Sequence, residues 1–315
     1  MIPADKTAFL FPGQGSQAVG MGADLAQDFP AARKVFELAD EQLGFSISGM
    51  AWNGPEEELN DTVNTQPALL VHSVAVLEVF REKYPEFQPK FVAGHSMGEL
   101  SALVASQALS YLEALKLVRI RGEAMRHAGE ISPGGMAAIL GLDIPTLEDV
   151  CTQASLPGEK VQVANDNCPG QVVISGATPA LERALELARA AGARRAVPLA
   201  VSIAAHSNLM EAAQAQFSQA VEQAPMQAPH VTIVGNVSAA PLTNEAAIRQ
   251  DLMAQLTSRV RWTESIQWMI SQGVQYFIEM GSESVLSGLL RRIDREAQAI
   301  SLGTPQDFDQ LSENH

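Results

Sequence analysis

Several residue types are scarce in this sequence, and each scarcity excludes a class of protein. Only Cys151 and Cys168 are cysteines among 315 residues. Two cysteines are too few for a disulfide framework or a metal cluster, so we expect reduced thiols. No run approaches the roughly 18 consecutive apolar residues of a membrane span. The N-terminus has no charged region followed by a long apolar one, so we expect no signal peptide and a cytoplasmic location.

Basic side chains are also in short supply. The chain has 21 Lys and Arg residues against 36 Asp and Glu, a formal net charge of −15. This balance argues against a nucleic acid or an anionic membrane as a non-specific partner, although a local basic patch remains compatible with it. Aromatic residues make up only 5%, so Ala, Leu and Val must fill most of the core. The apolar content of 46% is that of a globular protein long enough for one large domain and a smaller one.

The first part of the sequence alternates strand and helix patterns. Such alternation predicts an α/β fold with a doubly wound, mainly parallel sheet. The expected strands lie at residues 7–11 and 90–95, and the expected helices at 31–43, 67–83, 98–107 and 110–127.

The pattern changes after residue 131. The next segments are predicted in the order β-α-β-β-α-β, which is that of a ferredoxin-like unit. They cover residues 135–140, 145–154, 161–165, 171–175, 179–191 and 196–199. We therefore expect a small ferredoxin-like domain at 132–200, inserted into a large hydrolase-like domain at 1–131 and 201–305. The large domain resumes with strands at 231–237 and 274–280, and the acidic tail after about residue 303 is expected to fray.

One motif carries a candidate nucleophile. A G-x-S-x-G pattern with a strand-like entry and a helix-like exit is formed by Gly94-His95-Ser96-Met97-Gly98. Glycines on both sides of a serine permit a sharp turn that exposes its hydroxyl. The following helix offers free backbone N–H groups beside that hydroxyl, where an oxyanion develops. Ser96 is therefore predicted to be a nucleophile, the alternative being a glycine-flanked turn with an incidental serine.

A nucleophilic serine needs a base, and position in the sequence favours one histidine. His72 and His127 lie within predicted helices, where a structural role is the better interpretation. His230 is expected at the surface, His315 is terminal, and His95 next to Ser96 should point elsewhere. His206 follows the point where the small domain rejoins the large one, and loops at domain junctions often hold catalytic groups. A neutral imidazole there can accept the serine proton, although a capping or packing role stays open.

Two further features have a chemical interpretation. The loop at residues 13–18 departs from the phosphate-binding G-x-G-x-x-G pattern because position 18 is alanine. An amide side chain on this glycine loop could instead support an oxyanion hole. Arg121, in a predicted amphipathic helix, can bind a carboxylate through two hydrogen bonds. The alternative for Arg121 is a solvated charge on the helix face, which we expect for Arg119.

Taken together, these motifs resemble those of the malonyl-CoA:acyl-carrier-protein transacylase family, which includes the related acyltransferases of polyketide synthases. The resemblance covers roughly residues 5–300. It is carried by segments that occur in the family's order, at residues 11–17, 65–69, 94–99, 121–122, 165–171 and 202–206.

The resemblance implies roles for particular residues. Ser96 would be the nucleophile and His206 its base, held by backbone carbonyls rather than by a carboxylate. Gln14 and the backbone N–H of Met97 would form the oxyanion hole. Arg121 would pair with the malonyl carboxylate, and the remaining site residues would be Gln66 and Asn167. Malonyl-CoA would be a substrate, and no cofactor or metal is expected.

The partner implied is an acyl carrier protein, and the chain is expected to be a monomer. Carrier proteins are typically acidic, so docking on this acidic chain requires local basic patches. The candidates are Arg194-Arg195 and Arg291-Arg292, with ordinary solvated charges as the alternative.

The sequence also departs from the family pattern. Ala204 and Ala205 precede the base where bulkier residues are more usual, and Arg261 stands where a neutral amide is more usual near the base. These departures concern the choice of acyl group. The alternatives left open are a stand-alone polyketide acyltransferase, a thioester hydrolase and a catalytically silent carrier-binding scaffold.

Overall fold

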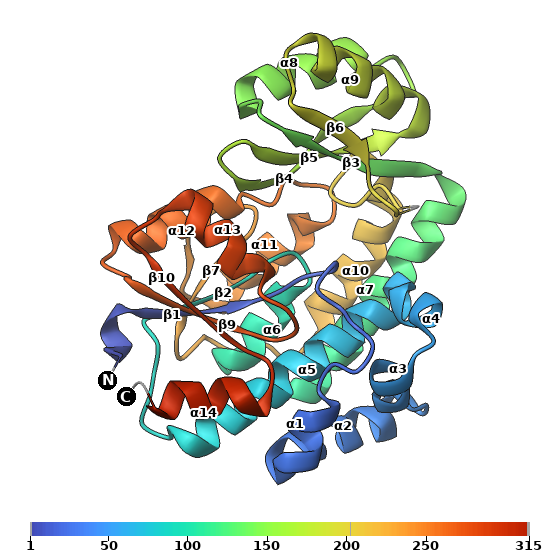
Figure 1. The fold of residues 1–315 in the computed structure, drawn as a ribbon. Coiled ribbons are helices and arrows are strands. Elements are labelled where there is room, and N and C mark those ends of the chain that lie inside the picture. Colours follow the sequence, from blue (N-terminus) through green and yellow to red (C-terminus); the bar gives the residue numbers. More distant parts are fainter. Residues whose placement is uncertain (1, 202, 314–315) are drawn as a thin grey trace.

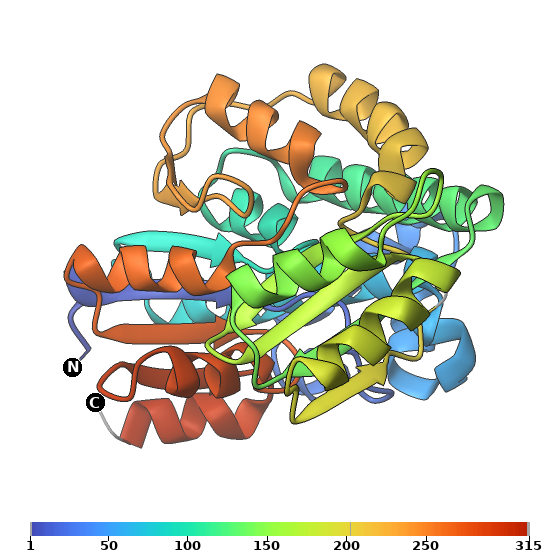
Figure 2. The same ribbon diagram turned by 90° about the horizontal axis from the view of Figure 1, so that it is seen from above.

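The fold is α/β and is built on two sheets, as the sequence predicted. The structure, a computed structural model, describes residues 2–201 and 203–313. Ser202, at the start of the predicted base motif, and His315 lie outside these ranges. Figures 1 and 2 show the smaller sheet and its helices on one side of the larger body, with the two chain ends close together.

The larger sheet is parallel except at one edge. Its six strands lie in the order β10-β9-β1-β2-β7-β8, and only β8 runs antiparallel to its neighbour. The strands are β1 (Thr7–Phe11), β2 (Phe91–Gly94), β7 (Thr232–Val234), β8 (Pro241–Leu242), β9 (Tyr276–Met280) and β10 (Gln298–Leu302).

Helices cover both faces of this sheet because its strands are apolar on both sides. Phe9 and Phe11 of β1 point into a core with α2, α5 and α6, whereas Ala8 and Leu10 point to α12 and α13. The helices outside the small sheet are α1 (Ala23–Asp28), α2 (Pro30–Leu43), α3 (Ile47–Asn53), α4 (Glu56–Asn60), α5 (Thr62–Lys83), α6 (Gly98–Ala105), α7 (Tyr111–Ile131), α10 (Glu211–Gln223), α11 (Glu245–Gln255), α12 (Trp262–Ser271), α13 (Val285–Ile293) and α14 (Pro305–Glu313), with short 3-10 turns at Ala4–Lys6 and Asn208–Met210.

The smaller sheet is antiparallel, with the order β4-β5-β3-β6. It consists of β3 (Gly134–Leu140), β4 (Val161–Cys168), β5 (Gln171–Ala177) and β6 (Arg195–Pro198), with helices α8 (Ile144–Ala154) and α9 (Thr178–Ala190). A separate hydrophobic core fills the space between this sheet and the two helices. The chain order and strand order are those of the expected ferredoxin-like unit, and all of its elements fall within residues 132–200.

Helix α5 begins five residues before the predicted start, although Pro67 lies inside it. Asp61 caps the helix by accepting from the Val63 N–H at 3.1 Å. A proline cannot donate to the carbonyl four residues earlier. Here that carbonyl, Val63 O, accepts instead from Arg119 Nη1 at 3.1 Å. The expectation that Arg119 is a solvated charge was therefore wrong, because it completes the hydrogen bonding of the neighbouring helix.

Length and hydropathy alone would also allow α5 to span a membrane, but 89% of the relevant window is buried inside the protein. Burial of this kind is typical of a central core helix. It packs between α2 and α7, and its apolar residues belong to the main core.

The acidic tail does not fray as expected. Residues 305–313 form α14, in which Phe308 is fully buried and Leu311 is buried. The carboxylate of Asp307 accepts from the N–H groups of Gly303 at 2.9 Å and Thr304 at 2.8 Å. The prediction of fraying rested on the acidic charge of the tail. Two apolar residues spaced three apart, Phe308 and Leu311, anchor this helix to the core.

Candidate active site

Ser96 lies on a sharp turn between β2 and α6, and three glycines permit that turn. The backbone φ of Ser96 is 53°, in the left-handed region. A Cβ on Gly94 would lie 1.9 Å from Gly98 O, and one on Gly98 would lie 2.3 Å from Phe11 O. A Cβ on Gly13 would lie 2.5 Å from His95 O, so the glycine loop also packs directly against the turn. Only glycine fits where these backbones approach one another.

Asn236, which the sequence analysis did not single out, fastens the turn. Its Oδ1 accepts from the Ser96 N–H at 2.8 Å, and its Nδ2 donates to Gly94 O at 2.7 Å. The residue is 2% exposed and follows β7, which is hydrogen-bonded to β2. A polar residue just after a buried parallel strand was the available signal, since sites form at the carboxyl ends of such strands.

The structure brings His206 to Ser96. The Ser96 Oγ–His206 Nε2 distance is 2.8 Å, and His206 Nδ1 lies 2.9 Å from Gln255 O. A carbonyl oxygen only accepts, so Nδ1 carries the proton and Nε2 is left to accept from the serine hydroxyl. No carboxylate among the described residues is bonded to this imidazole; the orienting group is the Gln255 carbonyl. The backbone φ of His206 is 58°, so both members of the pair have left-handed backbones.

Burial sets the protonation state of this imidazole. Desolvation first, and the charge of Arg121 second, lower the pKa of His206 to about 3. His206 is 2% exposed. Its imidazole is therefore neutral near pH 7 and able to accept a proton.

Arg121 lies beside the same hydroxyl. Its Nη2 donates to Ser96 Oγ at 3.0 Å and to Gln255 Oε1 at 2.8 Å, and its Nη1 donates to Gln66 Oε1 at 2.7 Å. The side chain is 1% exposed. Burial lowers the pKa of Arg121 to about 10, so the guanidinium stays charged at neutral pH. Its partners among the described residues are neutral acceptors, and its Nε has none.

A buried guanidinium without a carboxylate partner is costly unless a ligand supplies the negative charge. An anionic group bound next to the serine would supply that charge. The interpretation of Arg121 as a solvated helix-face charge is excluded by its burial.

Gln255 joins the members of the site, and nothing in its sequence context indicated this. Besides the contacts above, its Nε2 donates to Ser96 O at 3.1 Å and to the buried carboxyl group of Glu99. Burial, together with the nearby carboxyl group of Asp251, raises the pKa of Glu99 well above its usual range. Arg261, which occupies the position suspected of lying near the base, instead pairs with Glu264. The neutral amides near the serine are those of Gln255 and Asn236.

A chain of hydrogen bonds links Arg121 to the glycine loop. Gln66, which is fully buried, donates through Nε2 to Thr62 Oγ1 at 2.8 Å. The Thr62 hydroxyl donates in turn to Gln14 Oε1 at 3.0 Å. Gln14 is exposed, and Met97 stands at the N-cap of α6.

The remaining predicted residues lie on the small sheet or beside it. Asn167 Oδ1 contacts His95 Nε2 at 2.9 Å, so it touches the turn through the neighbour of Ser96. Burial lowers the pKa of His95, and its ring packs edge-on against Trp262. As expected, His72 has a structural contact, to Gly303 O at 3.0 Å.

The two arginine pairs lie at one end of the small sheet. Arg194 packs against Gly141, whose N–H donates to Gly170 O at 3.0 Å. Arg292, in the last turn of α13, donates to the Gln171 side chain. All four arginines are exposed, and these contacts place Arg194 and Arg292 beside the turn between β4 and β5.

Comparisons with known proteins agree with one another. The acyl transferase domain family matches residues 8–304. A malonyl CoA-acyl carrier protein transacylase of Bacillus subtilis is 46% identical over 304 residues, covering 96% of this chain and 95% of the relative. The crystal structure of a malonyl-CoA:acyl carrier protein transacylase from Xanthomonas oryzae has a TM-score of 0.95 at 41% identity, covering 100% and 99%. A malonyl-transacylase solved in complex with a type II PKS acyl-carrier protein has a TM-score of 0.94 at 40% identity, covering 99% and 100%.

Proposed function

Because the chain belongs to the acyl transferase domain family, we propose that it transfers malonyl groups from malonyl-CoA to the pantetheine thiol of an acyl carrier protein. One observation carries the proposal. The Ser96 hydroxyl is within hydrogen-bond distance of a neutral imidazole, at 2.8 Å, and of a buried guanidinium whose hydrogen-bond partners are all neutral, at 3.0 Å. The first contact supplies a nucleophile and its base, and the second supplies a site for a carboxylate.

The first half-reaction forms an ester on Ser96. His206 Nε2 accepts the hydroxyl proton while Oγ attacks the thioester carbonyl carbon of malonyl-CoA. The carbonyl electrons move to oxygen, and the backbone N–H of Met97 together with Gln14 stabilises that oxyanion. When the intermediate collapses, the carbon–sulfur bond breaks and coenzyme A leaves with the proton from His206.

The second half-reaction repeats these steps with a different thiol. The pantetheine thiol of the carrier protein gives its proton to His206, and its sulfur attacks the malonyl ester. Ser96 Oγ then leaves and recovers the proton. The two transfers are sequential on one serine, which is a ping-pong mechanism.

Arg121 accounts for the choice of a dicarboxylic acyl group. A single methylene separates the malonyl carboxylate from the reacting carbonyl, so the carboxylate reaches the guanidinium beside Oγ, with Gln66 and Asn167 lining the site. An acetyl group would leave the buried charge without a partner. The same unpartnered charge argues against a general thioester hydrolase.

We assign the protein to the supply of extender units for fatty-acid synthesis, acting as a cytoplasmic monomer. A polyketide pathway is the second candidate, because one relative was solved with a type II PKS acyl-carrier protein. Transfer from malonyl-, methylmalonyl- and acetyl-CoA, assayed in parallel against each type of carrier protein, distinguishes these roles.

Mass spectrometry after mixing with malonyl-CoA tests the mechanism. We expect a malonyl adduct on the Ser96 peptide, and none after Ser96→Ala because no other group can form the ester. An adduct on Cys151 or Cys168, or one that persists in the variant, contradicts the proposal.

A further inference from the structure

Strand β4 of the small sheet runs along the active site and contacts it at both ends. Near its start, Gln162 reaches the loop that carries His206. In its middle, Val260 N–H donates to Ala164 O at 2.8 Å, and Asp166 N–H donates to Val260 O at 2.9 Å. Near its end, Asn167 contacts His95. The edge of the small sheet is thus bonded to loops on both sides of the Ser96–His206 pair.

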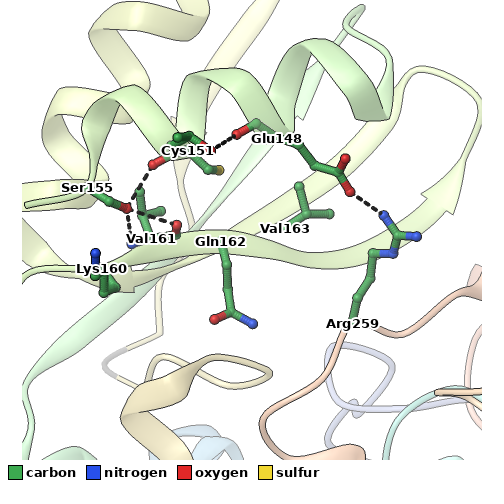
Figure 3. Close-up of a pocket in the computed structure, with 9 residues that line it drawn as sticks. Glu148, Cys151, Ser155, Lys160, Val161, Gln162, Val163 and Arg259 are labelled. Carbon is green, nitrogen blue, oxygen red and sulfur yellow. Dashed lines mark hydrogen bonds and ion pairs between the residues drawn. The ribbon is translucent and has the colours of Figure 1, made fainter.

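The Gln162 side chain uses all of its polar groups in these contacts. Its Nε2 donates to His206 O at 3.1 Å and to Thr257 O at 3.1 Å. Its Oε1 accepts from Asn208 N–H at 3.3 Å. Figure 3 shows the side chain leaving β4 on the side opposite Cys151 and α8, toward the loops of the larger body.

These bonds join the two loops that set the geometry of the base. One loop carries the imidazole, and the other, at Thr257, directly follows α11, whose last residue Gln255 supplies the carbonyl that orients the imidazole at 2.9 Å. No carboxylate helps to orient this imidazole among the described residues. Since the His206 backbone is also in the left-handed region, at a φ of 58°, its position must be held by surrounding contacts.

We propose that Gln162 is a positioning residue, which fixes the His206 loop relative to the Gln255 carbonyl and so keeps Nε2 on the Ser96 hydroxyl. The small sheet thereby takes part in the chemistry without touching the reacting atoms. The proposal rests on the proposed roles of Ser96 and His206.

Gln162→Met tests this assignment, because methionine has a similar length but cannot donate to the two carbonyls. We expect kcat for malonyl transfer to fall about tenfold or more, since misplacing a catalytic group by about 1 Å can cost up to 100-fold. The KM for malonyl-CoA should stay within about twofold, because Arg121 and Gln66 are untouched. The matched control is Gln153→Met, on the exposed face of α8, for which we expect wild-type values.

The pH profile of Gln162→Glu separates positioning from a general loss of structure. An ionised carboxylate cannot donate to His206 O or Thr257 O, whereas a protonated one restores a donor. The ratio of variant to wild-type rate should therefore rise as pH falls from 8 to 5. His206 stays neutral in this range because its pKa is lowered to about 3. The charged groups around the adjoining pocket are Lys160, Arg259 and Glu148, the last two paired at 3.1 Å.

Labelling of Ser96 by a fluorophosphonate distinguishes the failure of this proposal from failure of the proposed function. If wild-type protein is labelled but transfers no malonyl group, the proposed function is wrong, while the labelling rates still test Gln162. The assignment of Gln162 is overturned if Gln162→Met keeps its labelling rate and kcat within about twofold of wild type. A Gln162→Glu ratio that does not change with pH, or a kcat loss matched by Gln153→Met, overturns it equally.

Discussion

At the scale of single residues, the site is organised around a buried guanidinium to which no carboxylate among the described residues is hydrogen-bonded. Arg121 is buried among the acceptors Gln66, Ser96 and Gln255, all of them neutral. Neutral acceptors satisfy its hydrogen bonds but not its charge. A carboxylate entering the site gains a charge-assisted, two-point contact, which is stronger than the contacts it displaces.

Arg121→Ala should therefore change selectivity more than folding of the site. We expect malonyl transfer to fall by about tenfold to a hundredfold, because a charge-assisted hydrogen bond contributes about 1.5–3 kcal/mol. Acetyl transfer should be unchanged or faster, since it no longer faces an unpaired buried cation. Steady-state rates with the two acyl-CoA substrates measure this. Arg126→Ala on the same helix, where the side chain is 49% exposed, is the control, and equal losses for both acyl groups would show that Arg121 only supports the fold.

At the scale of helices and strands, the sequence was most informative where local chemistry decides the structure. The strands at β1 and β2, the turn at Ser96 and the β-α-β-β-α-β order were predicted because apolar runs and glycines act over a few residues. The start of α5 was missed, because an arginine 56 positions away satisfies the carbonyl that Pro67 leaves free. Such compensation depends on tertiary contacts and cannot be seen in a local pattern.

Tertiary contacts in the active site were hidden from local sequence patterns in the same way. Ser96, Arg121 and Gln14 stand in recognisable patterns, whereas Gln255 orients the base through a backbone carbonyl, which every residue possesses, and its side-chain contacts depend on tertiary structure. Gln162 lies in an ordinary alternating strand, so only its position opposite two loop carbonyls reveals its contacts. Residues that orient others through the main chain thus leave little trace in one sequence.

Helix α14 gives a direct test of tertiary anchoring. Phe308 is fully buried, and its ring packs against Phe29 with centroids 5.8 Å apart. Phe308→Ala should lower the free energy of unfolding by about 3–5 kcal/mol, the usual cost of removing a buried aromatic ring. Urea denaturation measures this, with the exposed Asp309→Ala, expected within about 0.5 kcal/mol of wild type, as its control. A loss of under about 1 kcal/mol would mean that Phe308 does not anchor the helix and that the tail frays.

At the scale of the whole molecule, the net charge opposes binding of an acidic partner, whereas a local cluster of basic residues favours it. The net charge of −15 repels an acidic carrier protein at long range. Arg194, just before β6, packs against Gly141, which is bonded to Gly170 in the β4–β5 turn after Asn167, and Arg292 of α13 donates to Gln171 beside that turn. Basic residues from distant parts of the sequence, Arg194 and Arg292, therefore lie at one end of the strand that borders the active site.

We predict that this end of the small sheet is where the carrier protein docks. Reversing Arg194 and Arg195 to Glu should raise the KM for the carrier protein several-fold, and reversing Arg291 and Arg292 should act in the same direction. Malonylation of Ser96 by malonyl-CoA should stay nearly unchanged, since the carrier takes no part in that half-reaction. The wild-type KM for the carrier should also rise with salt, because screening weakens exposed ion pairs.

The double variant Lys34→Glu/Lys116→Glu separates local docking from overall charge. It changes the net charge by the same amount as either arginine reversal, but its side chains lie exposed on α2 and α7. If docking is local, this variant keeps a KM for the carrier close to wild type, because repulsion between distant exposed charges is largely screened at physiological salt. An equal rise in KM for all three variants would mean that only net charge matters. A reversal that slows both half-reactions equally would place the arginines in coenzyme A binding or in the fold, and the docking assignment would be wrong.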